Sequence, residues 1–279
     1  GLLFAPSVPL IIYGVITETP IFDMFVAGAL PGVLMVIVLC TFSVFIATRA
    51  KTERSPLRWK AMGEALWEAK WEVPLPIVVL GGIYGGFFAV SEAAAVTAFW
   101  ALTVEVLINR EISLSQLKQV IRESMVMVGG ILIIMAAAMA STNYFIDVDV
   151  PSMIFDFIQG FVSTKIMFLI LLNIFLFGLG MILDIFSALV VVVPLITPIA
   201  QEYGINTIHL GIIFLANMQI GYLTPPLGMG LFISSYRFDK GILKITVACL
   251  PFIAMLIGSV LVITYWANLS LFLVRAMGK

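Results

Sequence analysis

A carboxylate lies in the middle of a long apolar stretch of this sequence. Asp184 stands between the segments GlyLeuGlyMetIleLeu and IlePheSerAlaLeu. Because an ionised group is costly at membrane depth, a carboxylate in such a stretch indicates a functional site. Asp184 either caps the helix that follows it or binds a ligand, and one carboxylate can do both. Ser187 and Thr224 are further candidate oxygen ligands, although hydroxyls in membrane helices often bond to their own backbone.

Other residues with acid–base or metal chemistry are sparse. Glu92, in the motif GlyGlyPhePheAlaValSerGluAlaAlaAla, is expected to hold a turn or to pair with another helix. His209 is the only histidine and is expected to be structural, since a lone histidine cannot build a zinc site. No GxxxxGK[ST] motif for ATP hydrolysis occurs. The lack of clustered His, Cys or paired acids argues against an enzyme.

Glycine and proline recur at matched places in two distant parts of the chain. The matches share a spacing of 220 positions, and they pair Gly1 with Gly221, Leu3 with Leu223, Pro6 with Pro226 and Leu30-Pro31 with Leu250-Pro251. Each copy is a broken segment followed by a long apolar run. A membrane tolerates the backbone groups that a break frees only where protein, ions or water satisfy them. Freed carbonyls suit Na⁺, and half-helix N-termini suit anionic groups.

The composition predicts that these segments lie in a membrane. Of the 279 residues, 62% are hydrophobic and 11% are charged, and the mean hydropathy is +1.14. Soluble domains hold about 45–50% apolar and about 25% charged residues, so lipid must cover the excess. The net charge of −1 gives no indication of nucleic-acid binding.

Seven apolar runs carry the predicted helices, and they are Leu2–Ile16, Phe22–Thr48, Val73–Ile108, Met125–Ile146, Ile166–Ala200, Thr207–Tyr236 and Ile245–Val274. A membrane span needs about 20 helical residues. Phe22–Thr48 and Ile245–Val274 therefore fit one tilted span each. Val73–Ile108 and Ile166–Ala200 are too long for one span and contain internal glycines, so each is predicted to form two short helices.

The polar breaks indicate the topology. Arg49–Trp71, with three tryptophans among charged residues, is predicted to form an amphipathic interfacial helix, and a solvated loop is the alternative. Its basic residues, and those of the predicted loop Asn109–Glu123, place both segments in the cytoplasm. This arrangement requires Val73–Ile108 to enter the membrane and return as a hairpin. The acidic segment Asp147–Lys165 suits the outside, whereas two basic residues at the C-terminus fall outside against the rule.

In this topology the two Gly/Pro-broken copies run in opposite directions. Inverted repeats with broken helices at corresponding positions are typical of secondary transporters. We therefore predict an all-α integral membrane protein. Its expected parts are 1–48 (end of the first repeat), 49–72 (interfacial arm), 73–146 (helical hairpin and scaffold span) and 147–274 (second repeat, with a hairpin at 166–200 and a broken helix at 207–236).

Five motifs, in order along the chain, resemble one family. They are GlyLeuLeuPheAlaProSerValProLeuIleIleTyrGly at 1–14, AlaGlyAlaLeuProGly at 27–32, SerGluAlaAlaAlaVal at 91–96, GlyMetIleLeuAspIlePheSerAla at 180–188 and GlyTyrLeuThrProProLeuGly at 221–228. Together they resemble the large membrane subunit of the tripartite ATP-independent periplasmic (TRAP) transporters.

The resemblance implies an elevator-type transporter with re-entrant hairpins in the bacterial inner membrane. Such a protein imports small organic acids, such as C4-dicarboxylates or sialate, with a Na⁺ gradient. It works with a small four-helix membrane subunit and a periplasmic substrate-binding protein. The alternatives are another secondary carrier or a channel that needs no binding protein, and a membrane-embedded enzyme or scaffold.

The resemblance also implies the binding residues. The first Na⁺ site maps onto Gly1, Leu3 and Pro6. The second Na⁺ site maps onto Gly180, Gly221, Leu223, Thr224 and Pro226. The substrate is expected to contact Ser7, Asp184 and Thr224.

The sequence departs from the family pattern in two places. The usual Pro-Pro-Ser is Ala5-Pro6-Ser7 here, and the loss of one proline is expected to soften the first break. The family also carries a Gly-Ser-Ser hairpin tip upstream, and this sequence begins after it. We therefore expect the N-terminal part of the subunit, with half of the first ion site, to be missing from these residues.

Overall fold

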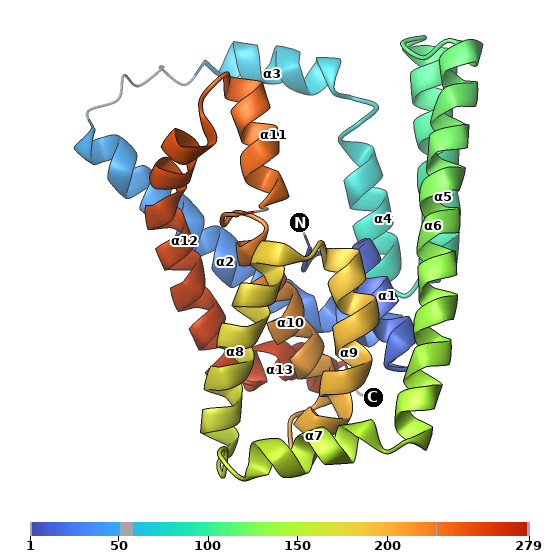
Figure 1. The fold of residues 1–279 in the computed structure, drawn as a ribbon. Helices are drawn as coiled ribbons and strands as arrows, with labels where there is room; N and C mark the ends of the chain where they lie inside the picture. Colours follow the sequence, from blue (N-terminus) through green and yellow to red (C-terminus); the bar gives the residue numbers. More distant parts are fainter. Residues whose placement is uncertain (1, 51–57, 227, 278–279) are drawn as a thin grey trace. The chain divides into compact units, whose positions relative to one another are not determined.

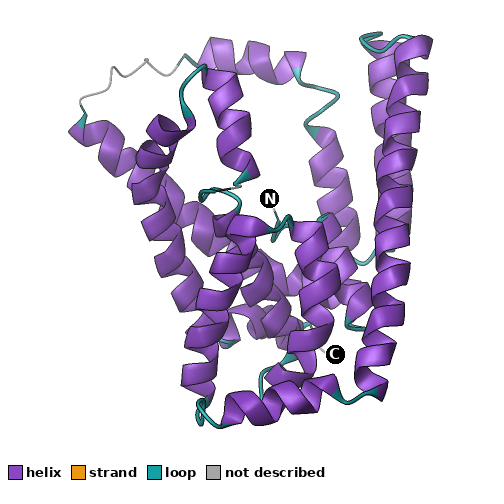
Figure 2. Cartoon of the chain, in the orientation of Figure 1, coloured by secondary structure: helices purple, strands orange, loops and turns teal. Residues whose placement is uncertain are grey.

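The computed structural model describes residues 2–50, 58–226 and 228–277, and within these ranges it contains helices and turns but no strand. Figures 1 and 2 show the helices along the chain. Six helical stretches are long and apolar enough to cross a membrane, and they are Ile21–Arg49, Val90–Ile108, Leu114–Ala137, Lys165–Ile182, Ile185–Glu202 and Ile242–Tyr265. The prediction of an all-helical protein with several membrane spans is confirmed.

The chain forms two compact units, one of Arg49–Leu132 and one of Gly1–Thr48 with Ile133–Lys279. The smaller unit contains α3 (Trp59–Glu68), α4 (Pro74–Tyr84), α5 (Val90–Leu102), the π-helix η1 (Thr103–Ile108) and the first part of α6 (Leu114–Asp147). The side chains of α3 are exposed along its whole length. Part of Arg49–Trp71 is therefore helical, as expected, while its place at a membrane interface stays a prediction and residues 51–57 lie outside the described residues.

A turn at residues 85–89 divides the run Val73–Ile108 into α4 and α5, which pack together. The ring of Phe88 folds back onto Gly82, where a side chain would overlap it. Glu92 Oε2 accepts a hydrogen bond of 2.9 Å from the Ala89 amide at the start of α5. The expectation that Glu92 holds the turn is therefore confirmed.

Helix α6 begins earlier than the sequence analysis predicted. Asn109–Glu123 was expected to be a loop, but the residues from Leu114 onward are helical. The cause is a capping box, in which the Ser113 amide donates to Gln116 Oε1 (2.9 Å) and the Gln116 amide donates to Ser113 Oγ (3.3 Å). These reciprocal bonds satisfy amides that a helix start leaves unpaired, so the charged segment begins the helix.

The larger unit holds the remaining helices, and these are α1 (Val8–Ile16), α2 (Ile21–Arg49), α7 (Val150–Gln159), α8 (Lys165–Ile182), α9 (Ile185–Glu202), α10 (Thr207–Gly221), α11 (Met229–Phe238), α12 (Ile242–Tyr265) and α13 (Asn268–Ala276). Helix α10 is the centre of its core. Its residues Leu210 and Ile212–Ala216 are fully buried, because α1, α8, α9, α12 and α13 pack around it (Figure 1).

Two segments differ from the sequence-based expectation. Ile245–Val274 was predicted as one span, but α12 ends at Tyr265 and α13 begins at Asn268. The carbonyl of Thr264 lies 3.2 Å from His209 Nε2. That side chain from α10 takes the place of the amide that would continue the helical ladder. The acidic segment Asp147–Lys165 contains the helix α7, whose Ile154 faces an apolar cavity.

The two Gly/Pro-broken copies have the same order of elements. Each begins with a turn that contains a cis peptide bond, before Pro6 and before Pro226. A short helix follows (α1 or α11), and then a long helix with an internal proline, Pro31 in α2 and Pro251 in α12. In Figure 1 the chain rises along α2 towards the grey trace and descends along α12. The matched helices therefore run in opposite directions.

Candidate functional site

Asp184 lies at the tip between α8 and α9, where the sequence analysis expected a break. Leu183 is extended (φ −102°, ψ 147°), and Asp184 is the N-cap of α9. Its Oδ2 accepts hydrogen bonds of 3.2 Å from the amides of Phe186 and Ser187, so the predicted capping role is confirmed. Asp184 is exposed, and its Oδ1 accepts no hydrogen bond from the described residues. The carboxylate can therefore cap the helix and still present one oxygen to a ligand.

A second break lies between α10 and α11 and contains Thr224. The Thr224 hydroxyl is buried and donates to the Ile220 carbonyl (2.9 Å), and its amide donates to the Gly221 carbonyl (3.0 Å). The Gly230 amide closes the turn onto the Tyr222 carbonyl (3.0 Å). The carbonyls of Leu223 and Thr224 accept no hydrogen bond from the described residues. Two backbone acceptors in this turn are thus open to a ligand.

The hairpin tip and the break meet through two glycines. A Cβ atom added to Gly221 would lie 2.5 Å from the Cα and carbonyl carbon of Gly180 and 2.7 Å from its carbonyl oxygen. The Leu183 amide still donates to the Leu179 carbonyl (2.8 Å), but the chain leaves the helix at Asp184, so the carbonyls after Leu179 lose their usual donors. Among the described residues, no amide donates to the Gly180 carbonyl. The end of α8 therefore presents an unpaired carbonyl beside Gly221, and the turn that begins after Gly221 presents two more.

The first broken turn spans Leu2–Ser7, while Gly1 lies outside the described residues. Ser7 is buried, and its hydroxyl donates to the Leu2 carbonyl (2.7 Å). Pro6 is exposed and Leu3 is buried. The Ser7 hydroxyl is thus engaged within the turn as a donor, and only its acceptor capacity remains for a ligand.

Two glycines on α2 seat this first turn, which the sequence analysis did not foresee. A side chain at Gly28 would overlap the Leu3 carbonyl oxygen. At Gly32, one turn later, an added Cβ would lie 2.8 Å from Cζ of the Phe4 ring. Two glycines four residues apart are the signal for such a close approach. They explain why the motif at 27–32 accompanies the broken turn.

The structure brings together one of the two predicted groups of residues. Gly180, Gly221 and Thr224 lie at the crossing of α8 and α10, and Asp184 follows four residues after Gly180. Pro226 is in the same turn but exposed. Helix α1 packs on α9 and α10, and the Tyr13 hydroxyl donates to the Thr207 carbonyl of α10 (2.7 Å).

Ser7 is not joined to this group by a direct bond. Among the described residues, no hydrogen bond connects Ser7 with Asp184 or Thr224. The two predicted half-sites are therefore separate turns of one unit.

A buried polar cluster also lies between α8, α10 and α12. The side chains of Asn173, Asn217 and Thr264 are hydrogen-bonded to one another. The sequence analysis passed over these residues, although two amides inside apolar runs are a visible signal. His209 is structural, as expected, since it is buried between Ser270 Oγ (3.2 Å) and the Thr264 carbonyl (3.2 Å).

The candidate ligand atoms at this site are oxygens of backbone carbonyls, a hydroxyl and a carboxylate. Within the part of the chain that the structure describes, no group of three or more His, Cys, Asp or Glu side chains is placed to hold a metal ion. Backbone carbonyls and a threonine hydroxyl are hard ligands, which suit a small monovalent ion at a broken helix.

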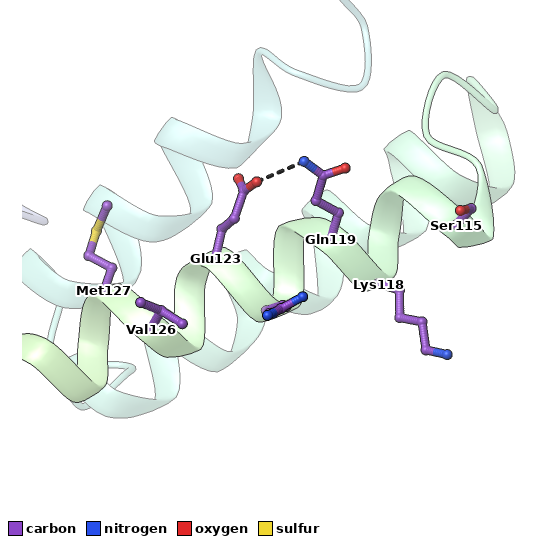
Figure 3. Close-up of a pocket in the computed structure, with 7 residues that line it drawn as sticks. Ser115, Lys118, Gln119, Glu123, Val126 and Met127 are labelled. Atoms are coloured by element: carbon purple, nitrogen blue, oxygen red, sulfur yellow. Dashed lines mark hydrogen bonds between the residues drawn. The ribbon is translucent and has the colours of Figure 1, made fainter.

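Two other hollows lie away from these residues. Figure 3 shows one on α6, where Lys118 and Arg122 belong to a polar stretch that gives way to Val126 and Met127. Gln119 donates to Glu123 within it (2.8 Å). All its lining residues come from one helix, so it is an open surface. The other, of about 380 Å³ between α7, α8 and α9, has an entirely apolar lining. The first has two cationic side chains but lies open on one helix, and the second has no polar lining, so neither encloses an organic anion with polar ligands.

Residues 1–269 match the family model described as "Tripartite ATP-independent periplasmic transporter, DctM component". The chain is 31% identical over 274 residues to the isethionate TRAP transporter permease protein DctMQ of Oleidesulfovibrio alaskensis, covering 98% of this chain and 43% of that protein. It is 33% identical over 283 residues to the C4-dicarboxylate TRAP transporter large permease protein DctM of Pseudomonas aeruginosa (100% and 65%). It is 31% identical over 258 residues to the sialic acid TRAP transporter large permease protein SiaM of Vibrio cholerae (92% and 60%). The chain thus spans 43% to 65% of the length of these relatives.

Proposed function

Because this chain belongs to the DctM component family of the tripartite ATP-independent periplasmic transporters, we propose that it forms part of a Na⁺-coupled importer of small organic anions. The family is one of membrane permeases, so the chain is a transporter component and not an enzyme. Na⁺ coupling, the substrate and the partners are parts of the proposal, and each is argued below from a feature of the molecule.

The crossing of Gly180 and Gly221 is the observation that carries the Na⁺ site. The carbonyls of Gly180, Leu223 and Thr224 accept no hydrogen bonds from the described residues. Unwound backbone and helix C-termini of this kind coordinate Na⁺ in secondary transporters. Bound Na⁺ would satisfy these oxygens, which are costly to leave unpaired at membrane depth. Ion binding would thereby order the hairpin tip against the broken helix.

Helix N-termini beside the same crossing support the anion site. Helix α9 begins after Asp184 and α11 begins after Gly228, and each N-terminus carries a partial positive charge. These ends suit the carboxylate of a substrate. The carboxylate of Asp184 would repel that group, so we assign Asp184 to a substrate hydroxyl or amine, or to the coupling ion. Thr224 and Ser7 supply further polar contacts.

The first half-site is proposed at the turn Leu2–Ser7. Its Leu3 carbonyl lies against Gly28 on one side, which leaves the other side of the oxygen for an ion. Gly1, Leu3 and Pro6 provide the backbone of this first Na⁺ site, and the substrate lies between the two half-sites. The opposite directions of α2 and α12 support an inverted repeat. Alternating access would follow if the α8–α9 hairpin, as a re-entrant element, moved with these turns as an elevator.

The proposed substrate class and partners are inferred from the names of the relatives. Their names refer to isethionate, a C4-dicarboxylate and sialic acid, and all of these compounds carry an acidic group. We therefore propose a small organic acid as the substrate. The name DctMQ joins two components in one protein, which supports a small membrane subunit as a partner here. A periplasmic binding protein would deliver the substrate in the bacterial inner membrane.

The proposal is tested by uptake of labelled organic acids into proteoliposomes that contain the complete subunit and its small partner. Import that requires both the binding protein and an inward Na⁺ gradient, and that fails with K⁺, supports it. Saturable import without the binding protein would favour another secondary carrier. Flux that does not saturate would favour a channel.

A further inference from the structure

The polar cluster of Asn173, Asn217 and Thr264 joins three helices inside the larger unit. Asn217 Nδ2 donates to Asn173 Oδ1 (2.8 Å), and Thr264 Oγ1 donates to the same oxygen (3.1 Å). All three side chains are buried, with exposed fractions of 8% or less. One amide oxygen on α8 thus receives donors from both α10 and α12.

Each amide is also fixed to its own helix. Asn173 Nδ2 donates to the Leu169 carbonyl (2.7 Å), and Asn217 Nδ2 donates to the Ile213 carbonyl (2.9 Å). Because both partners lie four residues earlier on the same helix, the amide planes cannot turn without losing a bond. The hydrogen bond between Asn217 and Asn173 therefore fixes the backbone of α10 relative to that of α8.

Thr264 is held from its other side as well. Its carbonyl lies 3.2 Å from His209 Nε2, and His209 Nδ1 lies 3.2 Å from Ser270 Oγ. Since a carbonyl can only accept, Nε2 carries the proton and Nδ1 accepts from the serine. The end of α12 is thus tied to the start of α10, and Thr264 brings a fixed donor to the cluster.

The cluster lies next to the glycine crossing. Asn173 is seven residues before Gly180 on α8, and Asn217 is four residues before Gly221 on α10, which correspond to about 10 Å and about 6 Å along the helices. Both contacts occur in the same order on both helices, so the helices run in the same direction. Two points of contact, one polar and one between glycines, define how α8 lies on α10.

Apolar packing alone does not fix this arrangement. A cavity of about 180 Å³ borders the two asparagines, and its other walls are mostly apolar, with Phe177, Ile220 and Val260 among them. Apolar contact is non-directional, and packing beside a cavity leaves room for helices to slide. Buried polar residues can instead specify one register between helices, as single asparagines do in coiled coils.

We propose that Asn173, Asn217 and Thr264 are positioning residues that hold α8 on α10 in the register which places the Gly180 carbonyl beside the broken helix, and so set the affinity for Na⁺. The inference rests on the proposed function. None of the three side chains needs to touch the ion. Loss of the cluster lets the helices shift, which spreads the carbonyl oxygens and weakens Na⁺ binding.

The test uses Thr264→Val in the complete subunit with its small partner and binding protein. Thr264→Ser keeps the hydroxyl. Thr246→Val is the matched control, because Thr246 lies on the same helix and its hydroxyl donates to the Ile242 carbonyl of that helix (2.9 Å) and, among the described residues, to no other helix. The readout is the Na⁺ concentration that gives half-maximal uptake at saturating substrate. We expect about a fivefold increase for Thr264→Val, the factor that corresponds to one buried hydrogen bond, and no change for the other two variants.

A triple variant protects the test from simple misfolding. In Asn173→Leu/Asn217→Leu/Thr264→Val all three members of the cluster become apolar, so no buried donor is left without its acceptor and stability can stay nearly unchanged. Its thermal unfolding should be close to that of the unsubstituted protein, while its half-maximal Na⁺ concentration rises. If uptake still depends on Na⁺ and the half-maximal Na⁺ concentration is unchanged in both this variant and Thr264→Val, the inference about the polar cluster is wrong. The proposed function is not affected by that result. If uptake by the unsubstituted complex is independent of Na⁺, both the inference and the proposed function are wrong.

Discussion

The backbones of Gly180 and Gly221 touch where α8 crosses α10, so closely that a methyl group on Gly221 would lie 2.5 Å from the Cα of Gly180. The contact joins the end of one helix of a hairpin to the end of a broken helix. The end of α8 carries the Gly180 carbonyl and the turn after α10 carries the carbonyls of Leu223 and Thr224, and none of these three oxygens accepts a hydrogen bond from the described residues. The proposed Na⁺ site, the helix N-termini proposed for the anion and the polar cluster that positions them all lie close to this crossing.

Asp184 is predicted to be needed for its charge as well as for its cap. Asparagine caps helices as well as aspartate does, so Asp184→Asn should insert and unfold like the unsubstituted protein. Asp184→Ala should insert as well, but lose about 1 kcal/mol of stability with the cap. We expect both variants to lose uptake, measured at equal amounts of protein in proteoliposomes. Near-normal uptake by Asp184→Asn would show that the charge is not needed for transport and that the residue acts only as a helix N-cap.

Glu92 is predicted to behave in the opposite way. Its carboxylate accepts from the Ala89 amide, and glutamine can make the same bond. Glu92→Gln should therefore keep both uptake and thermal stability, whereas Glu92→Ala should lower the unfolding temperature. Loss of uptake in Glu92→Gln, with the stability unchanged, would show that the charge has a transport role.

The turn Leu2–Ser7 is predicted to depend on the glycines of α2. Gly28→Ala would force its new methyl group into the Leu3 carbonyl, at a cost of about 1–3 kcal/mol. Gly32→Ala meets only the Phe4 ring, which can turn away, so its effect on uptake should be smaller. Gly258→Ala is the control, since no described atom lies within 4 Å of the added carbon. Equal uptake by Gly28→Ala and Gly258→Ala would contradict the assignment of this turn to the transport site.

The breaks that depend on local sequence were predictable. The glycine and prolines of 221–228 indicated the end of α10, and Asp184 indicated the start of α9, because capping and helix breaking act over a few residues. The pairing of Gly180 with Gly221 came from the resemblance to a family, since nothing in the spacing of two residues 41 positions apart predicts contact.

Features that depend on tertiary contacts were missed. The end of α12 requires His209 at the Thr264 carbonyl, and a hydropathy pattern contains no such information. The early start of α6 is a different kind of miss, because the Ser113 and Gln116 capping box is visible in the sequence but was not considered. The two asparagines of the polar cluster were visible too, but their partnership is a property of the fold.

The most direct test of the account is the Na⁺ dependence of uptake in three alanine variants of the crossing and its surroundings. Gly178 is on the same helix as Gly180, but no described atom lies within 4 Å of an added Cβ there, so Gly178→Ala should transport like the unsubstituted complex. At Gly180 the nearest atom is at 3.2 Å, and we expect a moderate increase in the half-maximal Na⁺ concentration. Gly221→Ala must displace backbone and should abolish Na⁺-driven uptake while the protein still inserts. Unchanged Na⁺ dependence in Gly221→Ala would contradict a Na⁺ site at the crossing of α8 and α10.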